Sequence, residues 1–270
     1  MNAVHACHNL DVQPLRTVRV TRYVTPLREG GSLPAIVEAD DEGLYVLKFR
    51  GAGQGPRALI AELVAGEIGR ALGLSVPELV FAEVDPELAR TEPDPEIHAL
   101  ILDSAGLNLA MDYLPGSVTY DPLIHAPDDD VASRIVWFDA YVMNVDRTAR
   151  NTNILLWHRR LWLIDHGAAL YFHHTPDWET DAARARDPFP RIAQHVLMPR
   201  AQSLDAIDAS MVGKLDVDVV RSIVDGIPAS WIQSGGIDID VARERTGYLR
   251  FLLDRLQNPR PFLTEALRGR

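Results

Sequence analysis

The sequence predicts an α+β protein with two lobes, a β-rich N-terminal lobe and a mainly helical C-terminal lobe. Short β-prone runs recur between residues 17 and 111, whereas apolar residues after residue 128 recur mostly with the period of a helix. Pro115-Gly116 lies between the two regions and would end the last strand of the first. We therefore expect a mobile lead over residues 1–16, an N-terminal lobe over 17–114 and a C-terminal lobe over 115–270.

Composition excludes several classes of protein. With 270 residues, 47% of them hydrophobic and 24% charged, the chain can bury a substantial core. Its single cysteine rules out an internal disulfide framework and is consistent with a reducing cytoplasm. The sequence has no apolar run of about 18 residues and no signal pattern at its start, so we expect a cytoplasmic protein without a membrane segment. The net charge of −11 argues against nucleic-acid binding.

The first lobe opens with two expected strands, Thr17 to Thr25 and Ala35 to Ala39. Gly30-Gly31-Ser32 lies between them, and glycines let backbone amides approach phosphates closely. An ordinary hairpin turn has the same composition. Gly51-Ala52-Gly53-Gln54-Gly55 is a competing phosphate loop, although its position favours a flexible lead into the next helix.

Lys48 stands out because the chain contains only two lysines among 27 basic residues. It ends the strand pattern that starts at Leu44, where a compact ammonium on a flexible stem could reach phosphate oxygens. A helix is expected from Pro56 to Leu74, because proline starts it and apolar residues follow at helical spacing. Glu62 or Glu67 on this helix could pair with Lys48, and we prefer Glu62 because it lies in the first half.

Later in the chain, three polar residues have the side chains that phosphoryl transfer requires. That reaction needs a carboxylate that orients the attacking hydroxyl, and an amide oxygen plus a second carboxylate that hold magnesium. Asp146, Asn151 and Asp165 supply these groups in that order. Two β-prone runs between Asn151 and Asp165 predict a tight hairpin, which would bring its two ends, and hence the two metal ligands, together. The sequence therefore predicts a kinase that uses ATP and Mg²⁺.

The proline- and acid-rich stretch from Asp85 to Glu96 is expected to be an exposed loop between strands. The strand predicted over Asn108 to Leu114 would follow it and lead into a hinge. In kinases, backbone groups at this place hold the adenine edge, so side chains give little warning of the contact. We expect Met111, Asp112, Tyr113 and Leu114 to form it.

Helices dominate the expected second lobe. Val131 to Met143 is predicted as a helix, because the aspartates before it can cap its start and complement its dipole. Further helices are expected over Asp216 to Val224 and Ile239 to Leu256, and the last of these has an apolar stripe at helical spacing.

Taken in order, these motifs resemble those of the HipA-like kinases. The resemblance rests on Gly30-Gly31-Ser32, Val46-Leu47-Lys48, Glu62, Asn144 to Asn151 and Leu163 to Gly167. It implies an atypical serine/threonine kinase, related to the phosphoinositide kinases, with a bilobed protein-kinase-like fold. The phrase from Trp162 to His174 is similar to the short branch of the family, and recognisable motifs cover residues 17 to 175.

The resemblance also implies roles for single residues. Lys48 would contact the nucleotide phosphates, Asp146 would be the catalytic aspartate, and Asn151 and Asp165 would bind magnesium. Thr148 departs from the pattern, because many relatives have a histidine after the Asp-Arg pair. The protein would then do without that histidine or use His166.

Alternatives to a Ser/Thr protein kinase stay open at this point. A small-molecule kinase that acts on antibiotics or sugars uses a similar Asp-to-Asn spacing. A second alternative is a nucleotide-binding regulator that transfers little or no phosphate, which would be consistent with Thr148 and the plain glycine loop. The resemblance further suggests a toxin module with a neutralising partner protein. Arg147 and Arg150 beside the catalytic residues could offset phosphate charge, meet an acidic acceptor or simply be solvated.

Overall fold

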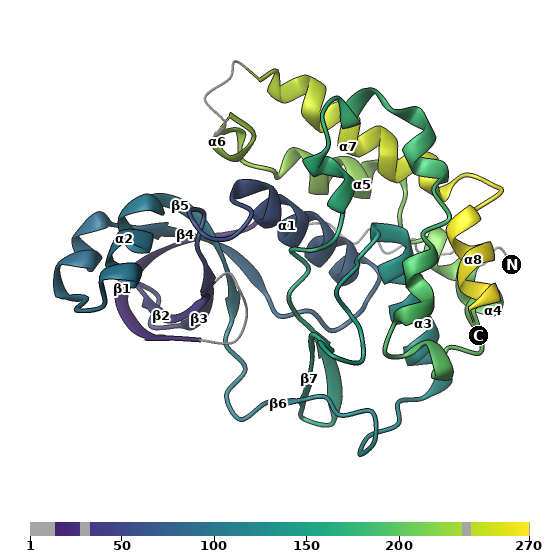
Figure 1. The fold of residues 1–270 in the computed structure, drawn as a ribbon, viewed down its shortest axis with the longest axis horizontal. Helices are drawn as coiled ribbons and strands as arrows, with labels where there is room; N and C mark the ends of the chain where they lie inside the picture. Colours follow the sequence, from purple (N-terminus) through teal and green to yellow (C-terminus); the bar gives the residue numbers. More distant parts are fainter. Residues whose placement is uncertain (1–13, 28–32, 234–238, 270) are drawn as a thin grey trace, which may run out of the picture.

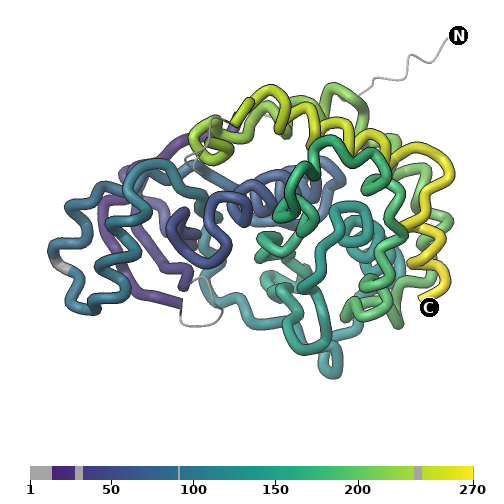
Figure 2. Tube along the Cα trace, turned by 45° about the horizontal axis from the view of Figure 1, so that its top comes forward, coloured from purple at the N-terminus to yellow at the C-terminus, as the bar shows by residue number. Residues whose placement is uncertain are grey.

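The computed structural model describes residues 14–27, 33–233 and 239–269, which form a mixed α+β structure. A closed barrel of strands stands at one end of the molecule, most helices gather at the other, and α1 runs between them (Figures 1 and 2). In pairing order the barrel strands are β1 (Thr17–Pro26), β2 (Ala35–Ala39), β3 (Leu44–Lys48), β5 (Gly106–Asp112) and β4 (Leu79–Val84).

Parallel pairing of β1 with β4 closes the barrel, with Val18 opposite Ala82. Side chains alternate along each strand, so that in β2 Ala35 and Val37 are buried inside while Glu38 lies outside. Closure leaves no free strand edge among the barrel strands. The barrel interior therefore forms an apolar core of its own.

The segment between β4 and β5 differs from its prediction. The proline- and acid-rich stretch from Asp85 to Glu96 was expected to be an exposed loop, but it contains a 3-10 helix at Pro86–Thr91 and the start of α2 (Pro95–Asp103). Asp85 and Asp94 each accept a hydrogen bond from the backbone two residues ahead. The aspartates are thus N-caps, and Pro86 and Pro95 occupy the first turns, where the missing N–H costs nothing.

Helix α1 (Pro56–Ala71) is buried along almost its whole length, and its apolar residues belong to the core of the helical part rather than to the barrel interior. Gly66 allows the helix to lie against β4, since a Cβ there would come within 2.6 Å of the Leu79 side chain. The helix therefore joins the two parts of the molecule.

The helical part consists of α3 (Asp129–Val142), α4 (Leu204–Val212), α5 (Val217–Asp225), α6 (Ala229–Ile232), α7 (Val241–Leu256) and α8 (Pro261–Arg268). A small antiparallel sheet of β6 (Val118–Thr119), β7 (Ile154–Trp157) and β8 (Arg160–Leu163) lies at its barrel-facing side (Figure 1). The predicted hairpin is β7–β8, and the predicted helices α3, α5 and α7 are confirmed to within two residues at each end. A run of short 3-10 helices connects β8 to α4, at Tyr171–His174, Trp178–Thr180, Ala182–Arg186, Pro190–Gln194 and Met198–Arg200.

Part of the expected lead is anchored. Arg16 donates hydrogen bonds to Glu78 at 2.9 Å and to the Tyr45 hydroxyl at 2.6 Å, and it also pairs with Asp41. Residues 1–13 lie outside the described part of the chain. Within the described ranges, no helix has the length and apolar character needed to span a membrane.

Candidate active site

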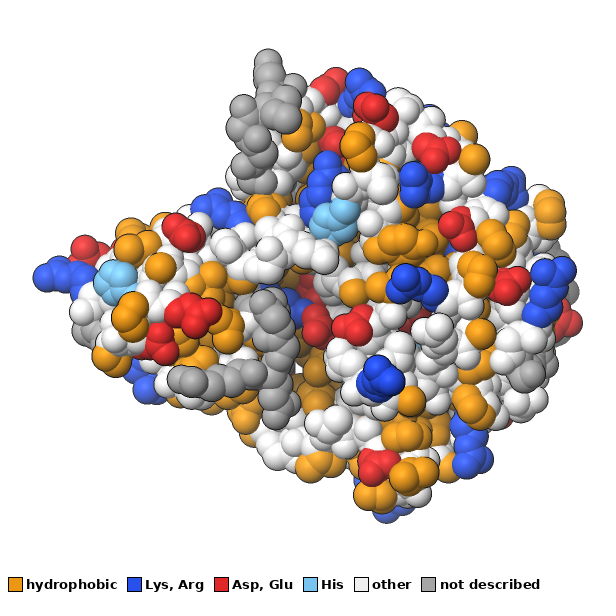
Figure 3. Space-filling model, viewed as in Figure 1, with side chains coloured by type: hydrophobic (Ala, Val, Ile, Leu, Met, Phe, Trp, Pro, Cys, Tyr) orange, Lys and Arg blue, Asp and Glu red, His pale blue; other side chains and the backbone are white. Residues whose placement is uncertain are grey.

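Lys48 lies between the barrel and the helical part, because it forms ion pairs both with α1 and with the chain after β8. Figure 3 shows a hollow between the two parts, with acidic side chains at its edge. Tyr45 and Leu47 point into the barrel, so strand alternation turns Lys48 outward to α1. Its ammonium forms an ion pair with Glu62 Oε2 and a second one, at 2.6 Å, with Asp165 Oδ1. The contact predicted between Lys48 and Glu62 is present.

Electrostatics fix the charges of this pair. Burial acts to lower the pKa of Lys48, which is only 11% exposed, but the carboxylates of Glu62 and Asp165 outweigh burial and raise that pKa. Burial likewise acts to raise the pKa of Glu62, but Lys48 and His166 hold it well below its usual range. Both groups are therefore charged at neutral pH, whereas Glu67, the other candidate partner, pairs with Arg70 at 3.2 Å.

His166 forms a hydrogen bond with Oε1 of Glu62, the carboxylate oxygen that does not contact Lys48. The fully buried imidazole donates from Nδ1 to Glu62 Oε1 at 3.2 Å and packs edge-on against Phe138. His166 therefore orients Glu62 and does not stand in for the histidine that Thr148 replaces. Thr148 instead closes its own loop, since its N–H donates to Asn151 O at 2.9 Å.

The predicted catalytic loop is compact. Asn151 Nδ2 donates to Asp146 Oδ2 at 2.8 Å, and the Asp146 N–H donates to Asn144 Oδ1 at 3.1 Å. Burial raises the pKa of Asp146, and the charge of Asp165 adds to that rise, while the amide of Asn153 opposes it. Asp146 is half-buried, so part of its side chain is accessible to solvent.

The hairpin places Asn153, and not the predicted metal ligand Asn151, opposite the end of β8. Ile164 N–H donates to Asn153 O at 3.1 Å, so Asn153 is the residue opposite the end of β8. Asn151, two residues earlier, turns to Asp146 instead, and Asp165 turns to Lys48. Both Asn153 and Asp165 have positive φ, 48° and 56°, which directs the chain out of the hairpin on each side.

Sequence reasoning missed the buried residue that supports this loop. The fully buried Asp139 of α3 accepts hydrogen bonds from Arg147 Nε at 2.7 Å, His195 Nε2 at 2.8 Å and Asn144 Nδ2 at 2.8 Å. Leu197 N–H donates to His195 Nδ1, which leaves the proton of a neutral imidazole on the nitrogen that faces Asp139. Burial acts to raise the pKa of Asp139, but Arg147 and His195 hold it well below its usual range. A lone aspartate within an otherwise apolar helical run was the signal that could have revealed it.

The same hydrogen-bond network shows the structural role of Arg147. Arg147 is buried, and besides Asp139 it donates to the backbone oxygens of Asn153 and Ile164. It therefore connects the catalytic loop to the hairpin, and none of the roles considered from the sequence (phosphate contact, contact with an acidic acceptor, or solvation) describes it. Arg150 is exposed in the same loop.

The predicted hinge lies at the end of β5. Met111 pairs with both neighbouring strands of the barrel, and the N–H groups of Asp112 and Tyr113 donate to Glu78 O and Leu44 O. Leu114 follows as the chain leaves the barrel.

Of the two glycine loops, Gly30-Gly31-Ser32 lies outside the described residues. Gly51 in the competing loop packs tightly, because a Cβ there would meet Asp103 Cβ at 2.9 Å and its N–H donates to Ser104 Oγ. The second loop is therefore a packed turn into α1.

The family model of the HipA-like kinases matches residues 20–260. The chain belongs to the HipA-like kinases. Among solved structures, this HipA-like kinase is similar to the Helicobacter pylori proinflammatory kinase CtkA, with a TM-score of 0.52, 15% sequence identity and coverage of 95% of this chain and 98% of that one. A golgi casein kinase aligns with a TM-score of 0.44 at 12% identity, covering 97% of this chain and 75% of the other. Comparison with curated protein sequences gave no significant match.

Family and fold agree with the geometry of the site. Membership in the HipA-like kinases makes the chain a phosphotransferase, and the likeness to CtkA extends over almost the whole of both chains. The resemblance found in the sequence is thereby confirmed at the level of the family.

Proposed function

We propose that this protein transfers the γ-phosphoryl group of ATP, with Mg²⁺, to a serine or threonine hydroxyl of a protein. One observation carries the proposal: Lys48 contacts Asp165 at 2.6 Å across 117 residues of sequence while it is paired with Glu62. An ammonium held between a helix carboxylate and a carboxylate from the end of a hairpin is the arrangement that kinase phosphate sites use. The acceptor class rests on the family resemblance.

The barrel and the helical part would act as the two lobes of the kinase. Met111, Asp112, Tyr113 and Leu114 connect them, and the backbone groups of this segment that form no hydrogen bond within the barrel would hold the adenine. The hollow between the parts would take the triphosphate (Figure 3).

The charges of the site fit a divalent cation. Glu62, Asp146 and Asp165 contribute three carboxylates and Lys48 contributes one ammonium, so a triphosphate would meet a net negative site. The described residues contain no cluster of three or more His, Cys, Asp or Glu side chains that could hold a metal. Mg²⁺ nevertheless fits this acidic site, because it usually takes one or two oxygen ligands from the protein and completes its coordination shell with phosphates and water.

Each residue would then have a distinct task. Asn151 and Asp165 would hold the cation, which neutralises charge on the phosphates when bound. Lys48, kept charged and in place by Glu62, would hold phosphate oxygens. Asp146 would orient the acceptor hydroxyl and take its proton, and its raised pKa brings it closer to the working pH than that of an exposed aspartate.

The test is transfer of labelled γ-phosphate from Mg-ATP to proteins of a host lysate. The variant Asp146→Ala should lose about 10² to 10⁴ of the rate while ATP still binds in calorimetry. Asp225→Ala, which removes an exposed carboxylate at the end of α5, is the matched control and should transfer at the wild-type rate. Equal transfer by wild type and Asp146→Ala would refute the assignment of Asp146.

A second variant tests the metal site. Asp165→Asn removes a metal ligand and one negative charge, so it should weaken ATP binding with Mg²⁺ present and strengthen it with EDTA present. Equal affinities of wild type and variant in both conditions would contradict a metal role for Asp165. Label that appears on small acceptors such as aminoglycosides or sugars, and on no protein, would replace the protein acceptor with a small-molecule one.

A further inference from the structure

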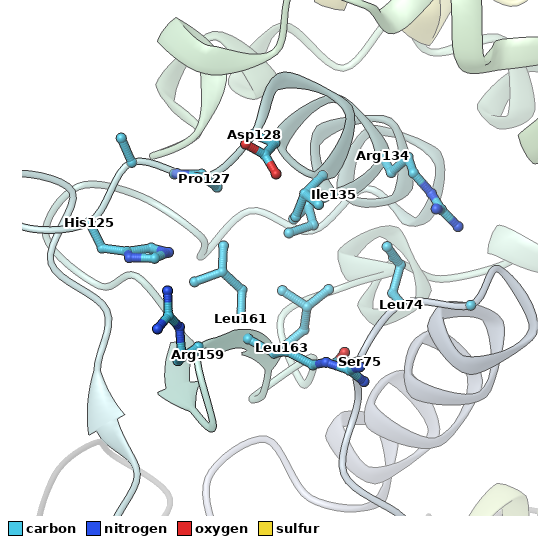
Figure 4. Close-up of a pocket in the computed structure, with 14 residues that line it drawn as sticks. Leu74, Ser75, His125, Pro127, Asp128, Arg134, Ile135, Arg159, Leu161 and Leu163 are labelled. Atoms are coloured by element: carbon cyan, nitrogen blue, oxygen red, sulfur yellow. The ribbon is translucent and has the colours of Figure 1, made fainter.

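A cavity of about 420 Å³ lies beside the β7–β8 hairpin (Figure 4). The turn after α1, the start of α3 and the hairpin enclose it. Its apolar lining is provided by Leu74, Val131, Ile135, Leu161 and Leu163. The volume is within the range of ligand sites, so the cavity can take a bulky aliphatic side chain with room to spare.

The mouth of the cavity is mostly basic. Arg159, Arg160 and His125 line it, and Asp128 faces them from the start of α3 (Figure 4). Neither Arg159 nor Arg160 forms an ion pair with another described residue, and both are exposed. In a chain with a net charge of −11, two adjacent unpaired guanidinium groups beside an apolar cavity favour an occupant that carries carboxylates.

The turn that carries Arg159 is strained. His158 and Arg159, the central residues between β7 and β8, have φ of 46° and 63°. Turns of this kind favour Asn-Gly, because other residues cost roughly 1–2 kcal/mol each in the left-handed region. Turn formation therefore does not explain the choice of Arg159, and strain of this kind concentrates at functional sites.

An apolar surface continues from the cavity. Leu123 and Ile124, in the loop between β6 and α3, are 93% and 85% exposed and immediately precede the lining residue His125. Hydrophobic side chains gather at the tip of the molecule over this loop (Figure 3). A small ligand inside the cavity would leave both residues in water, whereas a polypeptide could cover them.

We infer that this cavity is a docking site for a short segment of the protein acceptor, with a bulky aliphatic residue that enters the cavity and acidic residues that meet Arg159 and Arg160. The inference rests on the proposed function for the identity of the partner. It adds a place at which the acceptor is recognised away from its phosphorylated hydroxyl. Leu163 lines the cavity two residues before Asp165, so docking and catalysis share strand β8.

Binding can be measured without nucleotide. The probe is a fluorescein-labelled peptide of sequence Asp-Glu-Leu-Leu, followed by anisotropy, with Lys-Lys-Leu-Leu and Asp-Glu-Gly-Gly peptides for comparison. We expect saturable binding of the first peptide only. The double variant Arg159→Glu/Arg160→Glu should weaken it by about tenfold or more, since two attractions become repulsions. Val131→Asp, in the first turn of α3 where a carboxylate is tolerated, should weaken it by removing part of the apolar wall.

Arg191→Glu/Arg221→Glu reverses two exposed arginines elsewhere and should bind the peptide as wild type does. The inference would be overturned if wild type bound all three peptides equally, or if this control lost as much peptide affinity as Arg159→Glu/Arg160→Glu. Displacement of a bound dye by decanoate without any peptide binding would overturn it too, in favour of a small anionic ligand.

A kinetic readout separates this inference from the proposed function. Joining the Asp-Glu-Leu-Leu segment to a serine acceptor peptide should lower KM in wild type and not in Arg159→Glu/Arg160→Glu, with kcat unchanged. Peptide binding without phosphoryl transfer would refute the proposed kinase activity and leave a peptide-binding site. Transfer with no effect of the segment on KM would refute docking and leave the kinase.

Discussion

Replacing Asp139 by asparagine tests the network that supports the catalytic loop. Asp139 and Arg147 are both fully buried and joined at 2.7 Å, so Asp139→Asn leaves the guanidinium of Arg147 without a compensating charge. Breaking a buried pair by removing one partner costs about 3–5 kcal/mol. In a protein of this size, 1 kcal/mol lowers Tm by about 2 °C, so we expect a decrease of about 6–10 °C.

The assay is urea unfolding followed by circular dichroism, together with thermal scans. Arg147→Met and the double variant Asp139→Asn/Arg147→Met complete a double-mutant cycle, in which we expect a coupling of at least about 1 kcal/mol. The exposed ion pair of Glu87 and Arg90, at 2.6 Å, provides the control, since Glu87→Gln should change stability by less than about 1 kcal/mol.

Two results would refute this reasoning. A loss below about 1 kcal/mol in Asp139→Asn would mean that the carboxylate does not carry the buried charge balance. Additive effects of the two substitutions, within about 0.5 kcal/mol, would mean that Asp139 and Arg147 act independently.

Two pH dependences follow from other contacts. Asn153→Gly keeps the positive φ but removes the amide that lowers the pKa of Asp146. The acid limb of the pH–rate profile for phosphoryl transfer should therefore move to higher pH. If the acid limb stays where it is, Asp146 is not the titrating base. Burial holds the pKa of His173 well below 6.5, so the unfolded chain binds a proton that the folded one does not, and stability falls as pH drops below about 6.5. His173→Asn should reduce that slope by up to about 1.4 kcal/mol per pH unit, and an unchanged slope would contradict this assignment.

Local sequence patterns were sufficient to predict much of the fold. The hairpin between Asn151 and Asp165, the helix with Glu62 and the helix of Asp139 all follow from the spacing of apolar residues and from capping residues. Lys48 could be selected because lysine is scarce in this chain. These features depend on neighbours in sequence, which is why one sequence reveals them.

Contacts distant in sequence could not be predicted. Nothing local indicates that β1 pairs with β4, or that His195 reaches Asp139 across 56 residues. The stretch from Asp85 to Glu96 misled for a different reason: aspartate and proline mark loops and also helix starts, and only the packing of Ile97 and Ile101 into the barrel core decides between them.

The end of strand β8 is where the separate parts of the site meet. Ile164 accepts a hydrogen bond from Arg147 and donates one to Asn153, Leu163 donates to Ser75 at the cavity wall at 2.8 Å, and Asp165 follows directly. The buried Asp139 network therefore acts on the position of Asp165 through backbone bonds rather than through contact with a ligand. An occupant of the cavity would contact Leu163 of the same strand, so the supporting network and the docking site would both influence the position of the carboxylate that contacts Lys48.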